Sequence, residues 1–264
     1  PEKRAQVMQR IYGEDGANFS LARTPIGATD FSVEGRYSYA DVADDVNLEH
    51  FSIRPDEDGF ARSLYPGIRD ERFDLLPMIR EALAIKKSQA ENDLRIIASA
   101  WTAPAWMKDI EDWYQPGTEA NGYNGTGGSL KAEHASTFAD YIVRYLDAYR
   151  DAGVDIWGLT PVNEPLGNSG QWESMHFSAE SQNDFIKRHL GPALRKSGRD
   201  GIELLMLDHS RPDLEHWADV IYGDPETAQY VTGGAVHWYE STFKVYQDVF
   251  ERVHRKYPEF SIIH

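Results

Sequence analysis

Glu164 is the residue in this sequence that best fits the role of a general acid. It lies between Asn163 and Pro165, directly after the apolar run at 156–162 that predicts a buried strand. Pro165 has no backbone N–H for a neighbouring strand, so the strand must end here and leave Glu164 at its carboxyl end. In an α/β barrel, that end of the sheet carries the residues that bind ligands and do chemistry. An asparagine beside such a glutamate can bind a substrate hydroxyl.

Other polar or aromatic residues also follow predicted strands. They are Arg23, Trp101, Asp208 with His209, and His237 with Trp238 and Tyr239. If one sheet holds all these strands, the side chains lie close together at the carboxyl ends of the strands. Each residue taken alone also has a structural interpretation, because an arginine commonly forms an ion pair and a tryptophan commonly belongs to the core. Glu164 fits that interpretation less well, since a buried strand gives little structural reason for a charge.

Three kinds of chemistry can be considered for these residues. Two carboxyl groups can hydrolyse a glycosidic bond, one protonating the leaving oxygen and the other attacking the anomeric carbon in a retaining enzyme. Glu164 fits the first role, whereas Glu240 lies one residue too far past its strand for the second. A metal site at Asp208, His209 and His237 is the main alternative, and its ligands would have to meet across two strands. The sequence contains no H-x-H or H-E-x-x-H pair and no G-x-S-x-G elbow of a serine hydrolase.

Strands and helices are predicted to alternate over the whole chain. Strands are expected at 18–23 (ending at Thr24-Pro25), 94–101, 156–162, 202–207, 234–239 and 260–264. Helices are expected at 3–12, 73–87, 138–149, after a Ser178 cap, at 214–222 and at 243–257. Long loops are expected at 26–70 and 102–132, and loops of that length inside a compact domain are usually functional. The alternation implies parallel pairing, and eight such units close a (β/α)8 barrel. No G-x-G-x-x-G turn supports a nucleotide-binding fold instead.

Composition restricts the class of partner. The 264 residues are 41% hydrophobic, which is enough for one large domain with a substantial core. The net charge of −16 argues against nucleic acid, anionic membranes and polyanionic substrates, and favours neutral ones. The absence of cysteine excludes disulfides and thiolate sites. No apolar run approaches the roughly 20 residues of a membrane span, and the charged N-terminal segment is not a signal peptide.

Several segments, in this order, resemble glycoside hydrolase family 30, which includes glucosylceramidases and β-1,6-glucanases. They include SLARTPIGATDFS, SAWTAPAWMK, LTPVNEP, LLMLDHSR and AVHWY, and the resemblance covers nearly the whole chain. The resemblance implies a (β/α)8 TIM barrel with a retaining mechanism and no cofactor or metal. It further implies a carbohydrate substrate, such as a neutral β-glucoside or β-glucan, and a secreted or periplasmic protein. The oligomeric state stays open.

The resemblance also implies roles for individual residues. Glu164 would be the acid/base, Asn163 would hold the sugar 2-hydroxyl, and Arg23 would orient carboxylates. Further substrate contacts would come from Asp30 and Trp101 in the innermost subsite and from His237, Trp238 and Tyr239 along the pocket. The sequence departs from the family at Ala100, where proline is common, and at His209, so no catalytic role is assigned to His209.

The resemblance predicts an incomplete barrel, in which residues 1–264 form part of a catalytic domain. The first strand of the family would precede Pro1, and its nucleophile glutamate would follow a few residues after His264. The eighth strand and an attached β-domain would come later still. We therefore expect a retaining β-glycosidase whose nucleophile is supplied beyond His264. The alternative is a non-catalytic carbohydrate-binding protein or an inactive barrel fragment.

Overall fold

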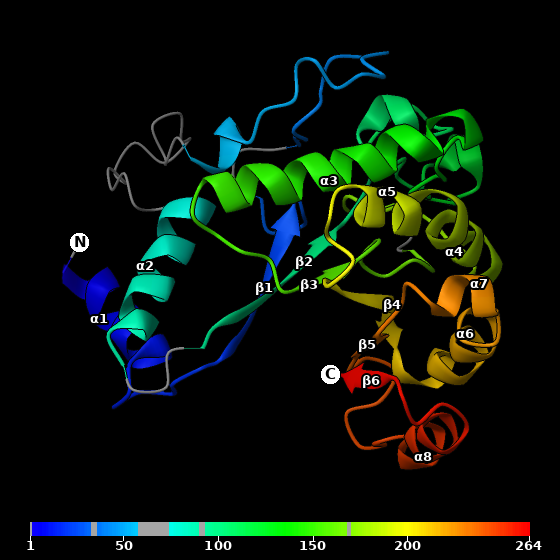
Figure 1. Cartoon of the computed structure of the whole chain (residues 1–264). Helices are drawn as coiled ribbons and strands as arrows, with labels where there is room; N and C mark the ends of the chain where they lie inside the picture. The colour runs from blue at the N-terminus through cyan, green and yellow to red at the C-terminus, as the bar shows by residue number, and fades with distance from the viewer. Residues whose placement is uncertain (1, 33–35, 58–73, 90–92, 168–169) are drawn as a thin grey trace.

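Parallel strands form the frame of the molecule. The structure is a computed structural model that describes residues 2–32, 36–57, 74–89, 93–167 and 170–264. Over these residues six strands pair in parallel in chain order, so each strand lies beside its neighbours in sequence (Figure 1). The strands are β1 Leu21–Ile26, β2 Arg95–Ala100, β3 Gly158–Thr160, β4 Glu203–Ser210, β5 Gly233–His237 and β6 Ser261–Ile263. The order and direction of the strands confirm the predicted alternation of strands and helices.

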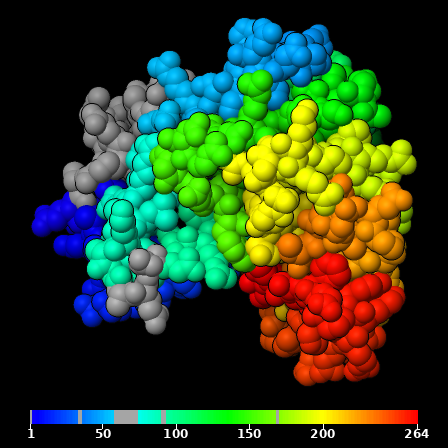
Figure 2. All heavy atoms as spheres, viewed as in Figure 1, coloured from blue at the N-terminus to red at the C-terminus, as the bar shows by residue number. Residues whose placement is uncertain are grey.

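Helices connect the strands. They are α1 Glu2–Tyr12, α2 Leu75–Lys87, α3 Ala135–Asp151, α4 Ala179–Phe185, α5 Gly191–Lys196, α6 Leu214–Ile221, α7 Pro225–Ala228 and α8 Gln247–Lys256, with a π-helical turn η6 at Ile186–Leu190. Short 3-10 turns occur at Arg54–Asp56, Ala105–Met107, Glu119–Asn121, Ala132–His134 and Arg211–Asp213. The N-terminal segment, in blue at the left, and the C-terminal segment, in red at the lower right, lie on opposite sides of the face seen in Figure 2. In the described parts of the chain, no helix is long and apolar enough to cross a membrane.

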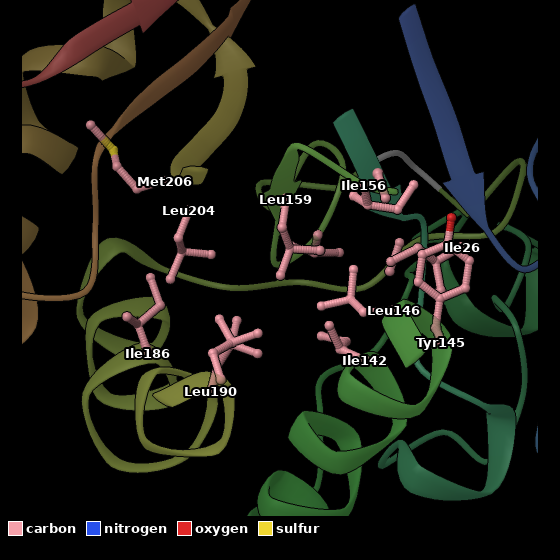
Figure 3. Packing of buried hydrophobic residues seen from close by; sticks show 14 of the residues in the cluster. Ile26, Ile142, Tyr145, Leu146, Ile156, Leu159, Ile186, Leu190, Leu204 and Met206 are labelled. Carbon is pink, nitrogen blue, oxygen red and sulfur yellow. The ribbon is translucent and has the colours of Figure 1, made fainter. Parts of the chain in front are cut away.

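The main core lies between the sheet and its helices. Strand residues such as Leu159 and Leu204 face apolar side chains of α3 and η6, including Ile142 and Leu190 (Figure 3). The opposite face of the sheet carries a smaller cluster centred on Ile97. Odd and even strand positions therefore separate into two faces, as the period of a strand requires. The predicted cap of α4 is confirmed, because the Ser178 side chain accepts a hydrogen bond from a backbone N–H one turn later.

Several predicted boundaries differ from the observed ones, and two of them differ for a clear local reason. Pro25 does not end the first strand but lies within β1, opposite Ser99. In the described sheet β1 is an edge strand, where a missing N–H can face away from the ladder. The last helix starts at Gln247 and not at Phe243, since Tyr246 has a left-handed backbone (φ 63°) that a helix cannot contain. Residues 33–35 and 58–70 of the first long loop, and Phe73 of the second predicted helix, lie outside the described residues.

A buried carboxyl group fixes the first long loop to the helical layer. Asp56 is fully buried and accepts hydrogen bonds from the hydroxyls of Tyr37 (2.9 Å), Tyr39 (2.5 Å) and Tyr149 (2.6 Å). The first two tyrosines belong to the loop after β1, whereas Tyr149 belongs to α3. Burial raises the pKa of Asp56 to about 6, although the three hydroxyl donors favour its charged form. The loop that leaves β1 is therefore anchored to α3 by a group that titrates in mildly acidic solution.

Replacing Asp56 with asparagine should change how stability depends on pH. The carboxyl pKa is raised from 3.8 to about 6 on folding, so the folded protein keeps a proton that the unfolded chain loses. This proton stabilises the wild type below about pH 4, and the contribution disappears as the pH rises through about 6, a change on the order of 3 kcal/mol. The Asp56→Asn variant should lack this decline.

Urea unfolding at a series of pH values measures the free energy of unfolding of both proteins. Asp41→Asn is the matched control, because Asp41 lies in the same loop but is exposed and accepts hydrogen bonds from Ser38. Parallel curves for wild type and Asp56→Asn would contradict the prediction.

Candidate active site

The strands β1 to β4 meet in a charged hydrogen-bond network. Arg23 of β1 donates from Nη2 to Oδ1 of Asn163 (2.8 Å) and to Oδ2 of Asp208 (2.6 Å). Its Nε donates to Oγ of Ser99 on β2 (3.1 Å), and the Thr160 hydroxyl of β3 donates to the same Asp208 oxygen (2.7 Å). The network therefore joins side chains from four strands, which agrees with the convergence expected from the sequence.

Asp208 is the residue on which this network closes, and a bulge in β4 places it there. The register between β4 and β5 skips Asp208, since Leu207 and His209 lie opposite consecutive residues of β5. Leu207 and Asp208 both have positive φ (69° and 63°), which costs non-glycine residues about 1–2 kcal/mol each. Bulges of this kind redirect side chains near active sites. Burial alone would raise the pKa of Asp208, but the Arg23 charge and the hydrogen bonds hold it well below its usual range.

His237, the last residue of β5, connects Asp208 to Glu164. Its Nε2 lies 2.9 Å from Oδ1 of Asp208, and its Nδ1 lies 3.0 Å from Oε1 of Glu164. Burial alone would lower the pKa of His237, but the hydrogen bonds to the two carboxylates outweigh it and raise the pKa to about 9. At neutral pH the imidazole is therefore charged, and both ring nitrogens donate. The charged imidazole thus lies between the carboxyl groups of Asp208 and Glu164.

The backbone holds Asn163 and Glu164 at the end of β3. The N–H of Asn163 donates to the carbonyl oxygen of Ala100 on β2 (2.6 Å), and the N–H of Glu164 donates to that of Asp208 on β4 (2.9 Å). Glu164 has φ 49°, a strained value of the kind that is found at functional sites. Its side chain is 17% exposed, so one end of the carboxyl group reaches solvent. These bonds explain why a short strand still positions the pair firmly.

Asp30 and Trp101 form a second unit beside the network. Trp101 donates from Nε1 to Oδ1 of Asp30 (3.1 Å), which joins the loop after β1 to the end of β2. The guanidinium of Arg23 lies 4.8 Å from the centre of the Trp101 ring, a cation–π contact. The unit is thereby linked to the charged network. The structure thus places both residues next to the charged network, and their role in an innermost subsite stays a prediction.

Trp238 and Tyr239 lie on the exposed rim, just after β5. Their side chains are 54% and 48% exposed, and their ring centres are 5.5 Å apart. The Tyr239 ring is 5.7 Å from that of His237. The pKa of Tyr239 is raised, mainly by burial and to a smaller extent by Glu164. Its hydroxyl therefore remains protonated at neutral pH. The predicted strand at 234–239 thus ends two residues early and leaves both rings free of the sheet.

The geometry does not favour a metal site at Asp208, His209 and His237. Asp208 accepts hydrogen bonds on both oxygens from protein donors, one of them His237 itself. Burial lowers the pKa of His209, and its Nδ1 is buried with no hydrogen-bond partner in the described chain. Over the residues that the structure describes, no three His, Cys, Asp or Glu side chains are grouped to hold a metal ion. Asp208 and His237 are therefore bonded to each other rather than arranged as metal ligands with His209.

The structure brings most of the predicted residues together and adds two. Arg23, Asn163, Glu164 and His237 belong to one continuous network, whereas Trp238 and Tyr239 approach it only through ring contacts. Two residues were not assigned to the site from sequence, namely Asp208, considered only as a metal ligand, and Arg211. Arg211 is buried and donates to backbone carbonyls of the loop after β5. The polar Asp-His-Ser sequence at the end of an apolar strand was the available signal for Asp208.

Comparison with known proteins gives the same family along the entire chain. Residues 1–264 match the glycosyl hydrolase family 30 TIM-barrel domain. The chain is 34% identical to the lysosomal acid glucosylceramidase of Mus musculus over 265 residues, which covers 98% of this chain and 45% of that protein. It is 31% identical to the endo-1,6-beta-D-glucanase neg1 of Aspergillus fumigatus over 238 residues, covering 88% of this chain and 44% of that protein. The chain thus spans less than half the length of these two relatives.

Solved structures agree with this result. The crystal structure of SrfJ from Salmonella typhimurium superimposes with a TM-score of 0.80 at 27% identity, over 99% of this chain and 51% of that one. The endo-beta1,6-glucanase BT3312 superimposes with a TM-score of 0.77 at 27% identity, over 99% of this chain and 52% of that one. The six-stranded sheet therefore corresponds to part of a TIM barrel, as expected from the sequence.

Proposed function

Because the chain belongs to glycosyl hydrolase family 30, we propose that it forms most of the catalytic barrel of a retaining β-glycosidase. Its substrates would be neutral β-glucosides, such as β-1,6-linked glucan or a glucosylceramide-like lipid, which are the substrates named for its relatives. The net charge of −16 supports a neutral substrate over a polyanionic one. We also propose that the protein acts outside the cytoplasm, as the family resemblance implies.

The observation that carries this proposal is the contact between His237 and Glu164. The charged imidazole occupies one oxygen, Oε1, of the Glu164 carboxyl group. The other oxygen has no hydrogen-bond partner among the described residues and is available for proton transfer. Glu164 would first protonate the leaving oxygen as the aglycone departs, and later take a proton from the attacking water. His237 fixes the carboxyl orientation for both steps.

The sugar would lie between this acid and the Asp30–Trp101 unit. Asn163 presents its amide beside Glu164, and its carbonyl oxygen is fixed by Arg23. No described residue accepts a hydrogen bond from the amide nitrogen, which would therefore be available to donate to a sugar hydroxyl. Asp30 keeps one carboxylate oxygen for sugar hydroxyls because Trp101 donates to the other. Trp238 and Tyr239 add aromatic surface of the kind that packs on sugar rings.

The second carboxylate of the mechanism would come from residues that follow β6. Asp208 is a poor candidate for this second carboxylate, since its side chain is only 3% exposed. Its oxygens already accept hydrogen bonds from Arg23, Thr160 and His237. Glu240 is exposed and lies in the loop beyond β5. A retaining mechanism places the two carboxyl groups about 5–5.5 Å apart. The end of a seventh strand beside β6 would face Glu164 across the mouth.

The stereochemistry of the first product tests this proposal. We expect a protein that includes the segment after β6 to hydrolyse an aryl β-glucoside and a β-1,6-linked glucan oligosaccharide. Proton NMR during the first minutes should detect the β-anomer of the released sugar before mutarotation, because two displacements retain configuration. Initial release of the α-anomer would contradict the retaining mechanism. Sugar binding without any hydrolysis would favour a carbohydrate-binding protein instead.

A further inference from the structure

We propose that Arg211 is a positioning residue that holds the loop at 238–246 against the active site. Arg211 follows directly on Ser210, which lies opposite His237 in the β4–β5 register. It therefore sits where the two strands that supply Asp208 and His237 both end. The part of the inference that concerns catalysis rests on the proposed function. The part that concerns the loop does not depend on it.

The contacts of Arg211 are unusual for an arginine. Its side chain is buried, and Nη2 donates to the backbone carbonyl oxygens of Trp238 (2.6 Å), Tyr239 (3.3 Å) and Ser241 (2.5 Å). The guanidinium also lies 5.3 Å from the centre of the Tyr246 ring. No described carboxylate forms an ion pair with it. Its charge is therefore met by the loop itself, and hydrogen bonds from a charged donor are among the stronger ones.

The loop has little else to hold it. Over the described chain, no other hydrogen bond joins residues 238–245 to the rest of the protein, and the loop contains no helix or strand. Two of its non-glycine residues, Glu240 and Tyr246, have positive φ (71° and 63°). Phe243 is 97% exposed. A strained, exposed segment of this kind needs an outside anchor to keep one conformation.

This anchor acts on the rim of the active site. The indole N–H of Trp238 and the hydroxyl of Tyr239 make no hydrogen bond to any described residue, so both stay available to a substrate. Their positions are fixed instead through their backbone carbonyls, which Arg211 binds. One side chain thereby places the Tyr239 ring beside His237, and the Trp238 ring beside that of Tyr239, without using the polar atoms of the rings. Arg211 is thus a determinant of site geometry that does not itself reach the substrate.

Limited trypsin digestion tests the anchor without reference to activity. Lys244 is exposed within the loop and offers one cleavage site, whereas Arg211 precedes Pro212 and is itself resistant. We expect Arg211→Met to be cleaved after Lys244 at least about 10-fold faster than wild type, because loop opening becomes easier. Arg211→Lys keeps the charge but not the planar fork and should be cleaved at an intermediate rate. Mass spectrometry identifies the cleaved bond.

Arg199→Met is the matched control. Arg199 is also largely buried, but it pairs with Asp147 on α3, away from the loop. The Arg199→Met variant should be cleaved after Lys244 at the same rate as the wild type. A folded Arg211→Met protein that is cleaved at the wild-type rate overturns the proposal. If only Arg211→Lys folds, a wild-type rate for that variant overturns it as well.

Steady-state kinetics test the effect on the site. In a protein that hydrolyses β-glucosides, Arg211→Met should lower kcat/KM by about 10- to 100-fold through misplaced aromatic rings, with partial recovery in Arg211→Lys. A wild-type kcat/KM in a variant with a loosened loop would overturn the link to catalysis. If the wild type has no activity, the proposed function fails, while the digestion still decides whether Arg211 anchors the loop.

Discussion

Glu164→Gln should slow the hydrolysis of β-glucosides with poor leaving groups by about 10²- to 10⁴-fold, the usual contribution of a general acid. Alkyl glucosides and β-1,6-linked oligosaccharides have leaving groups that would depart as alkoxides without a proton. The kcat/KM for these substrates should therefore fall most. An activated aryl glucoside needs little protonation, and its kcat/KM should change far less. Its kcat should still fall, because the same carboxylate activates water in the second step.

The size of the loss therefore depends on the leaving group, and this dependence is the measurement. Measuring kcat/KM over a series of aryl and alkyl β-glucosides gives its dependence on the leaving group, once for the wild type and once for Glu164→Gln. Glutamine preserves the shape of the side chain and an oxygen that can accept from His237, so a folding defect is not expected. Glu240→Gln is the control, since Glu240 is exposed in the neighbouring loop. Equal losses across the series would remove Glu164 from the acid role.

The position of Glu164 could be predicted because its cause is local. An apolar run precedes the glutamate, and a proline that cannot donate a hydrogen bond to a neighbouring strand follows it. The end of the strand can therefore be predicted from consecutive residues. The same holds for Trp101 after β2 and His237 at the end of β5. Parallel pairing then brings these ends to one edge of the sheet, whatever the loops do. The family resemblance added roles to the residues that this logic had placed, and it alone pointed to Asp30, which lies in a loop.

Asp208 could not be assigned in the same way. Its direction depends on a bulge in β4, which appears only when the strand pairs with β5. The binding of Arg211 to carbonyls 27 to 30 residues later is equally invisible in a local pattern. The anchoring of the first loop by Asp56 combines three tyrosines from two distant segments. Each of these features arises from tertiary contacts between segments that are far apart in sequence, which a local pattern does not record.

Asp208→Asn should change the charge state of the site and the stability of the fold together. Without the carboxylate, burial dominates the environment of His237, and its pKa should fall from about 9 toward or below its ordinary value of 6.5. Removing one member of a buried charged network should also lower the free energy of unfolding by about 3 kcal/mol near pH 6. NMR titration of the His237 ring and urea unfolding measure the two effects.

The sign of the pH dependence follows from His237. Its pKa is raised by folding, so the stabilisation is complete below about pH 6.5 and is lost as the pH rises through about 9. The stability difference between wild type and Asp208→Asn should therefore be largest near pH 6 and shrink at alkaline pH. Part of the difference should remain there, because Arg23 still pairs with Asp208 in the wild type. This pH range lies above the range assigned to Asp56. The variants Asp208→Asn and Asp56→Asn therefore separate the two contributions to the pH dependence of stability.

Asp147→Asn is the control for this experiment, since Asp147 also pairs with an arginine but is 42% exposed and far from any histidine of the site. It should leave the titration of His237 unchanged. An unchanged titration in Asp208→Asn would mean that Glu164 alone holds the proton on the imidazole. In that case Glu164 would be the stronger partner of His237, and its contact with the charged imidazole would favour the ionised carboxylate, so that Glu164 would hold less readily the proton that the leaving group needs. A lowered pKa would instead show that Asp208 holds the cation and leaves Glu164 free to act as the acid.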